Sequence, residues 1–386
     1  MKTLIYGAGP IGQWLALKLA QANRDVTLLA RGENLRMLEQ GGIVIKDALT
    51  GERLEARVQL VDRLDPEDRY DLVVAAMSRS SRLAVCPILA RNPHLRHILF
   101  LGNDVDGFHR YLDHLPPSKV LLGFPGAGGG VEDGQLKILD REKKNGKGEL
   151  YIGELDGRTR ERTEAIAALF ASGGLKVHAE PNIDGWLKYH FAFIGPTTGA
   201  IFKHGGDMKA VAADSDTIHQ YCRACRQAGD VLRAIGYHKR QPGIFNLYYW
   251  LPRWLEPKVF ARLFGSEVSA VRFGLHARTV GPELLEMAKD FEALKRRAGL
   301  DTPDLDALLA CVPQATPNTA RKPKPRYLVG PGPKRAARLA RIPVRLREWL
   351  IGKFMKSGVE RDAGEALEAD RTDLGIAEQS GEQGVS

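Results

Sequence analysis

The first twelve residues constrain the fold of this chain more than any other segment. The motif Gly7-Ala8-Gly9-Pro10-Ile11-Gly12 follows an apolar stretch, KTLIYG, and opens a helical pattern, IGQWLALKLAQAN. A G-x-G-x-x-G motif between a strand and a helix is the context in which a dinucleotide binds. Gly7 allows the tight turn, Gly9 leaves room for a pyrophosphate, and Gly12 lets the helix approach the strand. The residues predicted to contact this cofactor are Gly7, Gly9, Pro10, Ile11 and Gly12.

The first 180 residues alternate between short apolar runs and longer amphipathic runs. Strands are predicted at KTLIYG, DVTLLA, DLVVAAM, HILFLGN and KVLLGF. Several of these runs are apolar throughout, which is typical of strands buried on both faces of a parallel sheet. The alternation predicts an α/β domain over residues 1–180, with a Rossmann-like, doubly wound parallel sheet. Within residues 130–155, QLKILD and ELYIGE are expected to add antiparallel strands to the edge of that sheet.

A second, mostly helical domain is predicted over residues 181–315. WLKYHFAFIGPTTGAIF, residues 214–236 and residues 279–299 carry helical periodicity and few strand signals. Residues 316–386 are expected to form a third region, which begins as an extended linker because six prolines lie between 313 and 333. A basic amphipathic segment, interrupted at Pro343, and an acidic tail rich in Gly and Ser then follow.

The charge of the chain is concentrated near its C-terminus. The whole sequence has 56 Lys+Arg against 47 Asp+Glu, whereas residues 321–356 hold twelve bases and one acid. Residues 358–386 reverse this balance with eight acids and two bases, so the preceding body is nearly neutral and gives no sign of nucleic-acid binding. For the basic segment 334–356 we weigh three interpretations: a solvated helix, attachment to an anionic membrane surface, and contact with a partner protein or acidic surface.

The four cysteines of this long chain do not form a disulfide framework. Cys222 and Cys225 make a C-x-x-C within a helical pattern that has no second ligand pair nearby, so ordinary helix residues are favoured over a zinc site or a redox pair. No metal site is predicted. The apolar run after Lys2 is too short for a signal peptide, and none approaches the ~18 residues of a spanning helix. We therefore expect a cytoplasmic protein.

Arg31 follows the second predicted strand, where NAD-binding proteins usually carry an acid for the ribose hydroxyl. A guanidinium matches a 2′-phosphate and has no comparable partner in a bare hydroxyl, so NADP(H) is favoured over NAD. The alternative is a solvated surface arginine. Arg79, in MSRSSRL, is weighed equally as a second phosphate contact and as an exposed side chain.

Over roughly residues 1–312, the chain resembles the ketopantoate reductase (2-dehydropantoate 2-reductase) family. The resemblance rests on the run from GAGPIG to ARGENL, on LFLGND and on Trp186-Leu187-Lys188. It implies that Asn103 holds the nicotinamide ribose and the substrate, and that Lys188 is the general acid. It also implies that Glu283, sixteen residues before Gly299, binds the substrate.

Several positions depart from the family pattern. Asp104 replaces a Gly, Ala192 replaces an Asn four residues after the Lys, and the family's Asn-Pro pair appears as Gly195-Pro196, one residue early. A shift or kink of this helix is therefore expected. Val271 and Leu275 stand where the family has a Ser and an Asp that bind the pantoate end, and neither makes those hydrogen bonds. Ketopantoate itself is thus disfavoured as the substrate.

Lys188 also has a chemical argument of its own. A hydride delivered to a ketone leaves an alkoxide that needs a proton donor, whereas the alternative is a lysine that snorkels from an aromatic-rich helix. His190 is interpreted as a core or surface histidine in preference to a second acid. We predict an NADPH-dependent reductase of a 2-oxo acid or related small carbonyl compound, with its oligomeric state left open. The second hypothesis is a non-enzymatic NADP-binding protein with a regulatory or interaction role.

Overall fold

The computed structural model describes residues 1–48, 50–132, 135–139, 148–239 and 243–313. The chain divides into two units, Met1–Pro323 and Lys324–Ser386, and all the described residues belong to the first. The predictions made above for the linker, the basic segment 334–356 and the acidic tail lie outside the described residues.

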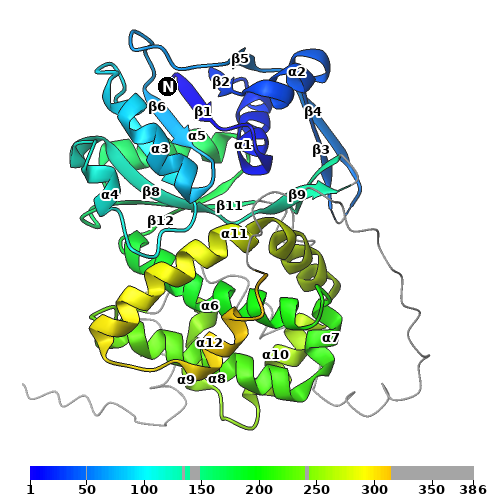
Figure 1. Cartoon of the computed structure of the whole chain (residues 1–386). Coiled ribbons are helices and arrows are strands. Elements are labelled where there is room, and N and C mark those ends of the chain that lie inside the picture. The colour runs from blue at the N-terminus through cyan, green and yellow to red at the C-terminus, as the bar shows by residue number, and fades with distance from the viewer. Residues whose placement is uncertain (49, 133–134, 140–147, 240–242, 314–386) are drawn as a thin grey trace, which may run out of the picture. The chain divides into compact units, whose positions relative to one another are not determined.

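An eight-stranded sheet forms the N-terminal half, in the order β12-β11-β8-β7-β6-β1-β2-β5 (Figure 1). All neighbouring strands are parallel except β11 and β8, which confirms the predicted α/β fold class. The strands are β1 (Thr3–Tyr6), β2 (Val26–Leu29), β5 (Gln59–Val61), β6 (Leu72–Ala75), β7 (His97–Leu101), β8 (Val120–Pro125), β11 (Glu149–Glu154) and β12 (Lys176–Ala179).

Helices cover both faces of this sheet, and each face has its own apolar core. Successive residues of β1 alternate between them, so that Ile5 packs with α1 (Pro10–Gln21) and α5 (Glu161–Ser172). Leu4 and Tyr6 instead share a core with α3 (Arg79–Ala90), α4 (His109–Leu112) and the start of α6 (Ile183–Lys203). Every residue of β1, β2 and β6 is buried, as their solid apolar sequences predict. The remaining helix of this half, α2 (Gly32–Gly41), follows β2.

A second, four-stranded sheet has the order β4-β3-β10-β9. Its strands are β3 (Ile43–Asp47), β4 (Arg53–Ala56), β9 (Gly128–Glu132) and β10 (Gln135–Leu139). The prediction that QLKILD extends the main sheet is therefore wrong, because β10 pairs with β3 and β9. ELYIGE does join the main sheet antiparallel to β8, but not at its edge, because α5 returns the chain so that β12 pairs outside β11.

The C-terminal half of the described chain is helical, as predicted. α6 runs without a break through Pro196 and packs against α8 and α12. At one contact a Cβ on Gly199 would lie 2.4 Å from the carbonyl oxygen of Leu308, so only glycine allows this approach. The other helices are α7 (Met208–Ala213), α8 (Ser215–Ala234), α9 (Leu247–Trp250), α10 (Glu256–Phe264), α11 (Glu267–Ala298) and α12 (Pro303–Leu309). Short 3-10 turns cover Pro117–Lys119 and Gly243–Asn246.

α11 is longer than predicted and begins at Glu267, where the Ser266 side chain accepts a hydrogen bond from the Ser269 amide. Cys222 and Cys225 are both buried in α8, and burial raises the pKa of both thiols. Within the described ranges, no His, Cys, Asp and Glu side chains gather in a group of three or more that fits a metal ion. No helix of that same part is long and apolar enough to cross a membrane.

Candidate functional site

The turn between β1 and α1 has the shape that the glycine motif predicts. Gly7 has a φ of +121°, and a Cβ there would lie 2.5 Å from the carbonyl oxygen of Ala76. A Cβ on Gly12 would lie 1.8 Å from the carbonyl oxygen of Gly7, so the first turn of α1 packs directly against the backbone of Gly7. A Cβ on Gly9 meets nothing within 4 Å, which leaves open space beside the helix N-terminus. Because α1 has no acid in its first turn and no side-chain cap, this turn fits the phosphates of a dinucleotide.

Arg31 lies at the end of β2 and precedes the first residue of α2. Its side chain is exposed, and its guanidinium lies 5.8 Å from the centre of the Tyr6 ring and 3.4 Å from the Tyr6 hydroxyl. The acid nearest in sequence, Glu33, forms an ion pair with Arg36. The guanidinium thus lies beside the strand end at which a nucleotide ribose would be expected.

Asn103 follows β7 at the carboxyl end of the parallel sheet and is 5% exposed. Its Oδ1 lies 2.9 Å from Nδ1 of His190, a residue of α6. The His190 ring stacks on Trp186, with ring centres 5.3 Å apart, and contacts Phe124 of β8 at 4.1 Å. The sequence interpretation of His190 missed this pairing because the two partners are 87 residues apart.

Lys188 is 3% exposed on α6 and pairs with Asp184 one turn earlier. The Tyr237 hydroxyl donates a 2.7 Å hydrogen bond to the other oxygen of Asp184, and the Lys188 Nζ lies 5.0 Å from the Tyr237 ring centre. A Cβ on Gly107 would lie 3.4 Å from this Nζ and 3.1 Å from Asp184 Oδ1. The ammonium is therefore adjacent to the loop that carries Asn103.

Arg82, at 1% exposed, is the centre of a buried polar network behind the Asn103 loop. Its guanidinium donates to the carbonyl oxygens of Met77, Leu101 and Asn103, at 2.9, 2.9 and 2.7 Å. It also donates to the Tyr111 hydroxyl at 3.0 Å and pairs with Asp104 at 3.4 Å. Burial raises the pKa of the Asp104 carboxyl, and the adjacent Arg82 opposes this shift.

Arg79 is buried, so the alternative that it is an exposed surface side chain is wrong. Its guanidinium, 5% exposed, forms ion pairs with Asp106 at 2.7 Å and with Asp290 of α11 at 2.9 Å. A longer contact of 3.6 Å joins it to Asp104. Burial raises the pKa of Asp290 to about 6, although Arg79 opposes this shift. These contacts tie α3 and the loop after β7 to the helical part of the chain.

Glu283 lies in α11 near the same two arginines. Its carboxylate accepts a hydrogen bond from the backbone amide of Arg79, at the start of α3, and interacts electrostatically with Arg82. Burial raises the pKa of this carboxyl. The structure thus brings Glu283 to the arginine network, beside the loop of Asn103.

Four residues near the predicted site were not singled out from the sequence: Asp184, Tyr237, Arg82 and Asp290. The four-residue spacing of Asp184 and Lys188 on a helix is a visible signal for an ion pair. Tyr237 and Asp290 approach their partners across 53 and 211 residues of chain, and no local pattern indicates such contacts.

A family comparison covers the part of the chain that holds the glycine turn, Arg31 and Asn103. Residues 3–157 match the model of "Ketopantoate reductase PanE/ApbA". This N-terminal part of the chain is therefore similar to the ketopantoate reductase family. Ala192, which the resemblance places where the family has an Asn, is fully buried on α6. The side chains at positions 271 and 275 lie outside the described part.

Curated relatives match less than half of this chain. The 2-dehydropantoate 2-reductase of Pyrococcus abyssi is 26% identical over 188 residues, which are 48% of this chain and 59% of that protein. The enzyme of the same name from Mesorhizobium japonicum is 39% identical over 83 residues, or 21% of this chain and 24% of that protein. The chain therefore spans little more than half of the first of these relatives and about a quarter of the second.

Solved structures share the fold over most of the chain. A 2-dehydropantoate 2-reductase from Geobacter metallireducens superposes with a TM-score of 0.65 at 17% identity, covering 81% of this chain and 99% of that one. A ternary complex of D-mandelate dehydrogenase with NADH and anilino(oxo)acetate also superposes with a TM-score of 0.65, at 18% identity, and covers 81% of this chain and 97% of that one. At these identities, the likeness establishes the fold.

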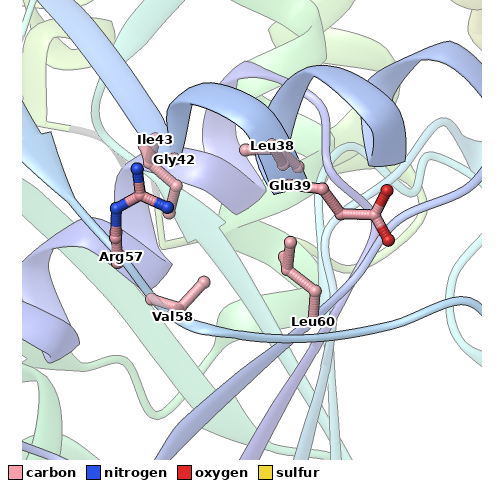
Figure 2. A pocket seen from close by; sticks show the side chains of 7 residues that line it. All are labelled: Leu38, Glu39, Gly42, Ile43, Arg57, Val58 and Leu60. Carbon is pink, nitrogen blue, oxygen red and sulfur yellow. The ribbon is translucent and has the colours of Figure 1, made fainter.

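A surface pocket of about 220 Å³ lies elsewhere, at the C-terminal end of α2 (Figure 2). Its lining includes Leu38 of that helix and Gly42 directly after it, together with Val58 and Leu60, and Glu39 and Arg57 stand at its sides. None of the predicted site residues lines it. The pocket is therefore separate from the glycine turn and from the Lys188 site.

Proposed function

We propose that this chain is an NADPH-dependent reductase of a 2-oxo acid or a related small carbonyl compound. The observation that carries the proposal is the placement of Lys188. Its buried ammonium lies beside the loop that follows β7 and carries Asn103, at the carboxyl edge of a parallel sheet. In open α/β sheets, ligands bind at this edge, and a carbonyl reduction needs a proton donor there.

The nucleotide would be held by the turn from Gly7 to Gly12 and by Arg31. Backbone amides at the start of α1 face the open space beside Gly9, and Arg31 supplies a guanidinium for a 2′-phosphate. Bound NADPH supplies the hydride. The NADH in the mandelate dehydrogenase structure supports a nicotinamide cofactor, and Arg31 supports its phosphorylated form.

Lys188 would give its proton to the oxygen of the reduced carbonyl. Asp184 holds the ammonium from one turn below, and Tyr237 in turn donates a hydrogen bond to Asp184. Asn103 would position the substrate and the ribose, since its carbonyl oxygen is taken by His190 and its amide NH₂ remains to donate. Glu283, near Arg82 and the loop, would contact a polar group of the substrate.

A screen of NADPH consumption against a panel of 2-oxo acids tests the activity. The panel includes 2-dehydropantoate and the 2-oxo acid that corresponds to mandelate. With a substrate in hand, Lys188→Ala is expected to lower kcat by about 10²–10⁴-fold with little change in NADPH affinity. Lys188→Arg should also be slow, because a guanidinium does not readily release its proton. Lys203→Ala, at the exposed end of the same helix, is the matched control. A Lys188→Ala enzyme with the unmutated kcat would remove Lys188 from the proposal.

Cofactor choice is tested by titration calorimetry on the purified chain. Arg31→Ala should weaken NADPH binding by about 10–150-fold, from a lost charge-assisted contact of roughly 1.5–3 kcal/mol, and should leave NADH binding unchanged. Arg36→Ala, one turn further along α2, is the control because its guanidinium already pairs with Glu33. Equal affinity of the unmutated chain for NADPH and NADH would defeat the assignment of Arg31.

A non-enzymatic NADP-binding protein is the second candidate. The specific observation in its favour is Ala192, whose methyl group occupies a fully buried position where the family has a hydrogen-bonding Asn. This candidate predicts tight NADPH binding without turnover of any 2-oxo acid in the panel. Turnover that depends on Lys188 would exclude it.

A further inference from the structure

Two tryptophans are exposed at the junction of α9 and α10. Trp250 and Trp254 are each 68% exposed, the largest exposed fractions among the bulky apolar side chains that the structure describes. They are four residues apart in the segment YYWLPRWLE. The helices α9 and α10 lie in the helical part of the chain, away from the sheets (Figure 1). The intervening turn is held by a hydrogen bond from the Leu255 amide to the Pro252 carbonyl. Single apolar residues on a surface are common, whereas a pair of exposed tryptophans on an ordered turn indicates an interaction site.

The exposed charges within the segment that carries this pair, residues 247–265, are basic. Arg253 lies between the two tryptophans, Lys258 lies over the Trp254 ring at 5.3 Å, and Arg262 is exposed further along α10. Residues 247–265 contain one acid, Glu256, which is 1% exposed and pairs with Arg226. We call the set Trp250, Arg253, Trp254, Lys258 and Arg262 the Trp patch. It combines amphipathic aromatic rings with positive charge.

We propose that the Trp patch binds the surface of an anionic lipid bilayer. Tryptophan rings favour the boundary between lipid headgroups and acyl chains, because one end of the indole is apolar and the other donates a hydrogen bond. Basic side chains beside them are attracted to the negative surface potential of anionic lipids. An apolar side with Trp and a polar side with Lys and Arg is the pattern of peripheral, interfacial membrane contacts.

Charge argues against two other occupants of this surface, a second copy of the chain and the basic segment 334–356. A second copy of the chain would bring the same three bases against one another in a twofold contact, which costs affinity. The basic segment 334–356 of the same chain carries like charge and is repelled for the same reason. A negatively charged surface removes this repulsion, and a bilayer also accepts two tryptophans without a shaped pocket.

Co-sedimentation of the full chain with sucrose-loaded vesicles tests the proposal. Vesicles of phosphatidylcholine alone are compared with vesicles that also contain phosphatidylserine. Arg253→Gln with Lys258→Gln should weaken binding to the anionic vesicles by roughly 25-fold, or about fivefold per basic residue, and should leave weak binding to neutral vesicles unchanged. Trp250→Ala with Trp254→Ala should weaken binding to anionic vesicles by about tenfold or more. The matched control for the basic residues is the double variant Arg36→Gln with Arg57→Gln, and the control for the tryptophans is Leu300→Ala. All three residues are exposed outside the Trp patch.

A second measurement places the tryptophans in the lipid. In a Trp349→Phe chain, the remaining tryptophans are the exposed pair and Trp14 and Trp186, which are 0% and 3% exposed. Quenching of fluorescence by brominated lipid then reports on the Trp patch, and we expect it to disappear in the doubly substituted chain. Far-UV circular dichroism and the melting temperature verify that the variants fold.

Three results would overturn the proposal. The first is vesicle binding that the tryptophan substitutions leave unchanged, which would assign any binding to residues 334–356. The second is the absence of binding to anionic vesicles at low salt. The third is an oligomer, measured by sedimentation velocity without lipid, that the tryptophan substitutions convert to a monomer, because this would make the patch an interface between copies of the chain. None of these readouts depends on reductase activity.

Discussion

Replacing Arg82 by Met tests how the loop that carries Asn103 is held. The guanidinium is buried and donates to three backbone carbonyls around this loop, and it also contacts Tyr111 and Asp104. Methionine keeps the aliphatic stem and removes every donor. Because the Asp104 carboxylate is only 2% exposed, water does not replace the lost partner.

The expected loss follows from the unpaired groups that remain. Removing one partner of a buried ion pair typically costs about 3–5 kcal/mol, since the other charge stays buried without compensation. The carbonyl oxygens of Met77, Leu101 and Asn103 lose their donor as well, so the cost of Arg82→Met should lie toward the upper end of this range. Arg79, 3.6 Å from Asp104, offsets part of the cost. We therefore expect a loss of roughly 4 kcal/mol in the free energy of unfolding.

Urea unfolding at neutral pH, followed by near-UV circular dichroism, measures this loss. Arg36→Met is the control: its side chain is 72% exposed, and its unfolding free energy should change by less than about 0.5 kcal/mol. Arg82→Met with Asp104→Asn should be more stable than Arg82→Met alone, because the buried charge is gone. A loss below about 1 kcal/mol for Arg82→Met would refute the reasoning, since the network would then not hold the loop.

Two further predictions concern the glycine turn and the α11 contact. Gly9→Val should keep the melting temperature of the unmutated chain and bind NADPH at least about tenfold more weakly, because the valine side chain enters open space at the phosphate position. Gly12→Ala should unfold at lower temperature, because its Cβ meets the Gly7 carbonyl. The pKa of Asp290 is raised to about 6, so its contribution to stability is fully present below the unfolded pKa of about 3.9 and is lost as pH rises through 6. Asp290→Asn should remove this dependence, of roughly 2–3 kcal/mol between pH 4 and 7, and identical pH profiles for both chains would contradict it.

The sequence predicted the features that depend on local pattern. Solid apolar runs gave β1, β2 and β6, because strands buried on both faces need no polar alternation. The glycine motif predicted the β1–α1 turn because steric contact leaves no alternative residue at Gly7 and Gly12. Local pattern did not predict the partner of QLKILD, since a short strand of mixed polarity pairs equally well with either sheet.

The candidate site was predictable where one helix or one loop carries it. Asp184 is visible from its spacing to Lys188, but Tyr237 reaches the same carboxylate from another part of the chain. The sequence left Arg79 open between a phosphate contact and an exposed side chain, because its buried partner Asp290 lies 211 residues further on. Such ion pairs form only when the helical part meets the sheet, so no periodicity in the sequence records them.

Asp104 illustrates how a departure from a family pattern changes meaning in three dimensions. In the sequence it is a departure from the family pattern, since the resemblance places it where the family has Gly. In the structure its carboxylate accepts hydrogen bonds from the Tyr111 hydroxyl and pairs with Arg82. Gly102 provides the backbone freedom in this loop, since its φ is +142° and a Cβ would lie 2.1 Å from the Arg82 guanidinium. The acid, the arginine and the glycine therefore form one compensated arrangement, so Asp104 argues for a loop held differently and not for a loop that has lost its role.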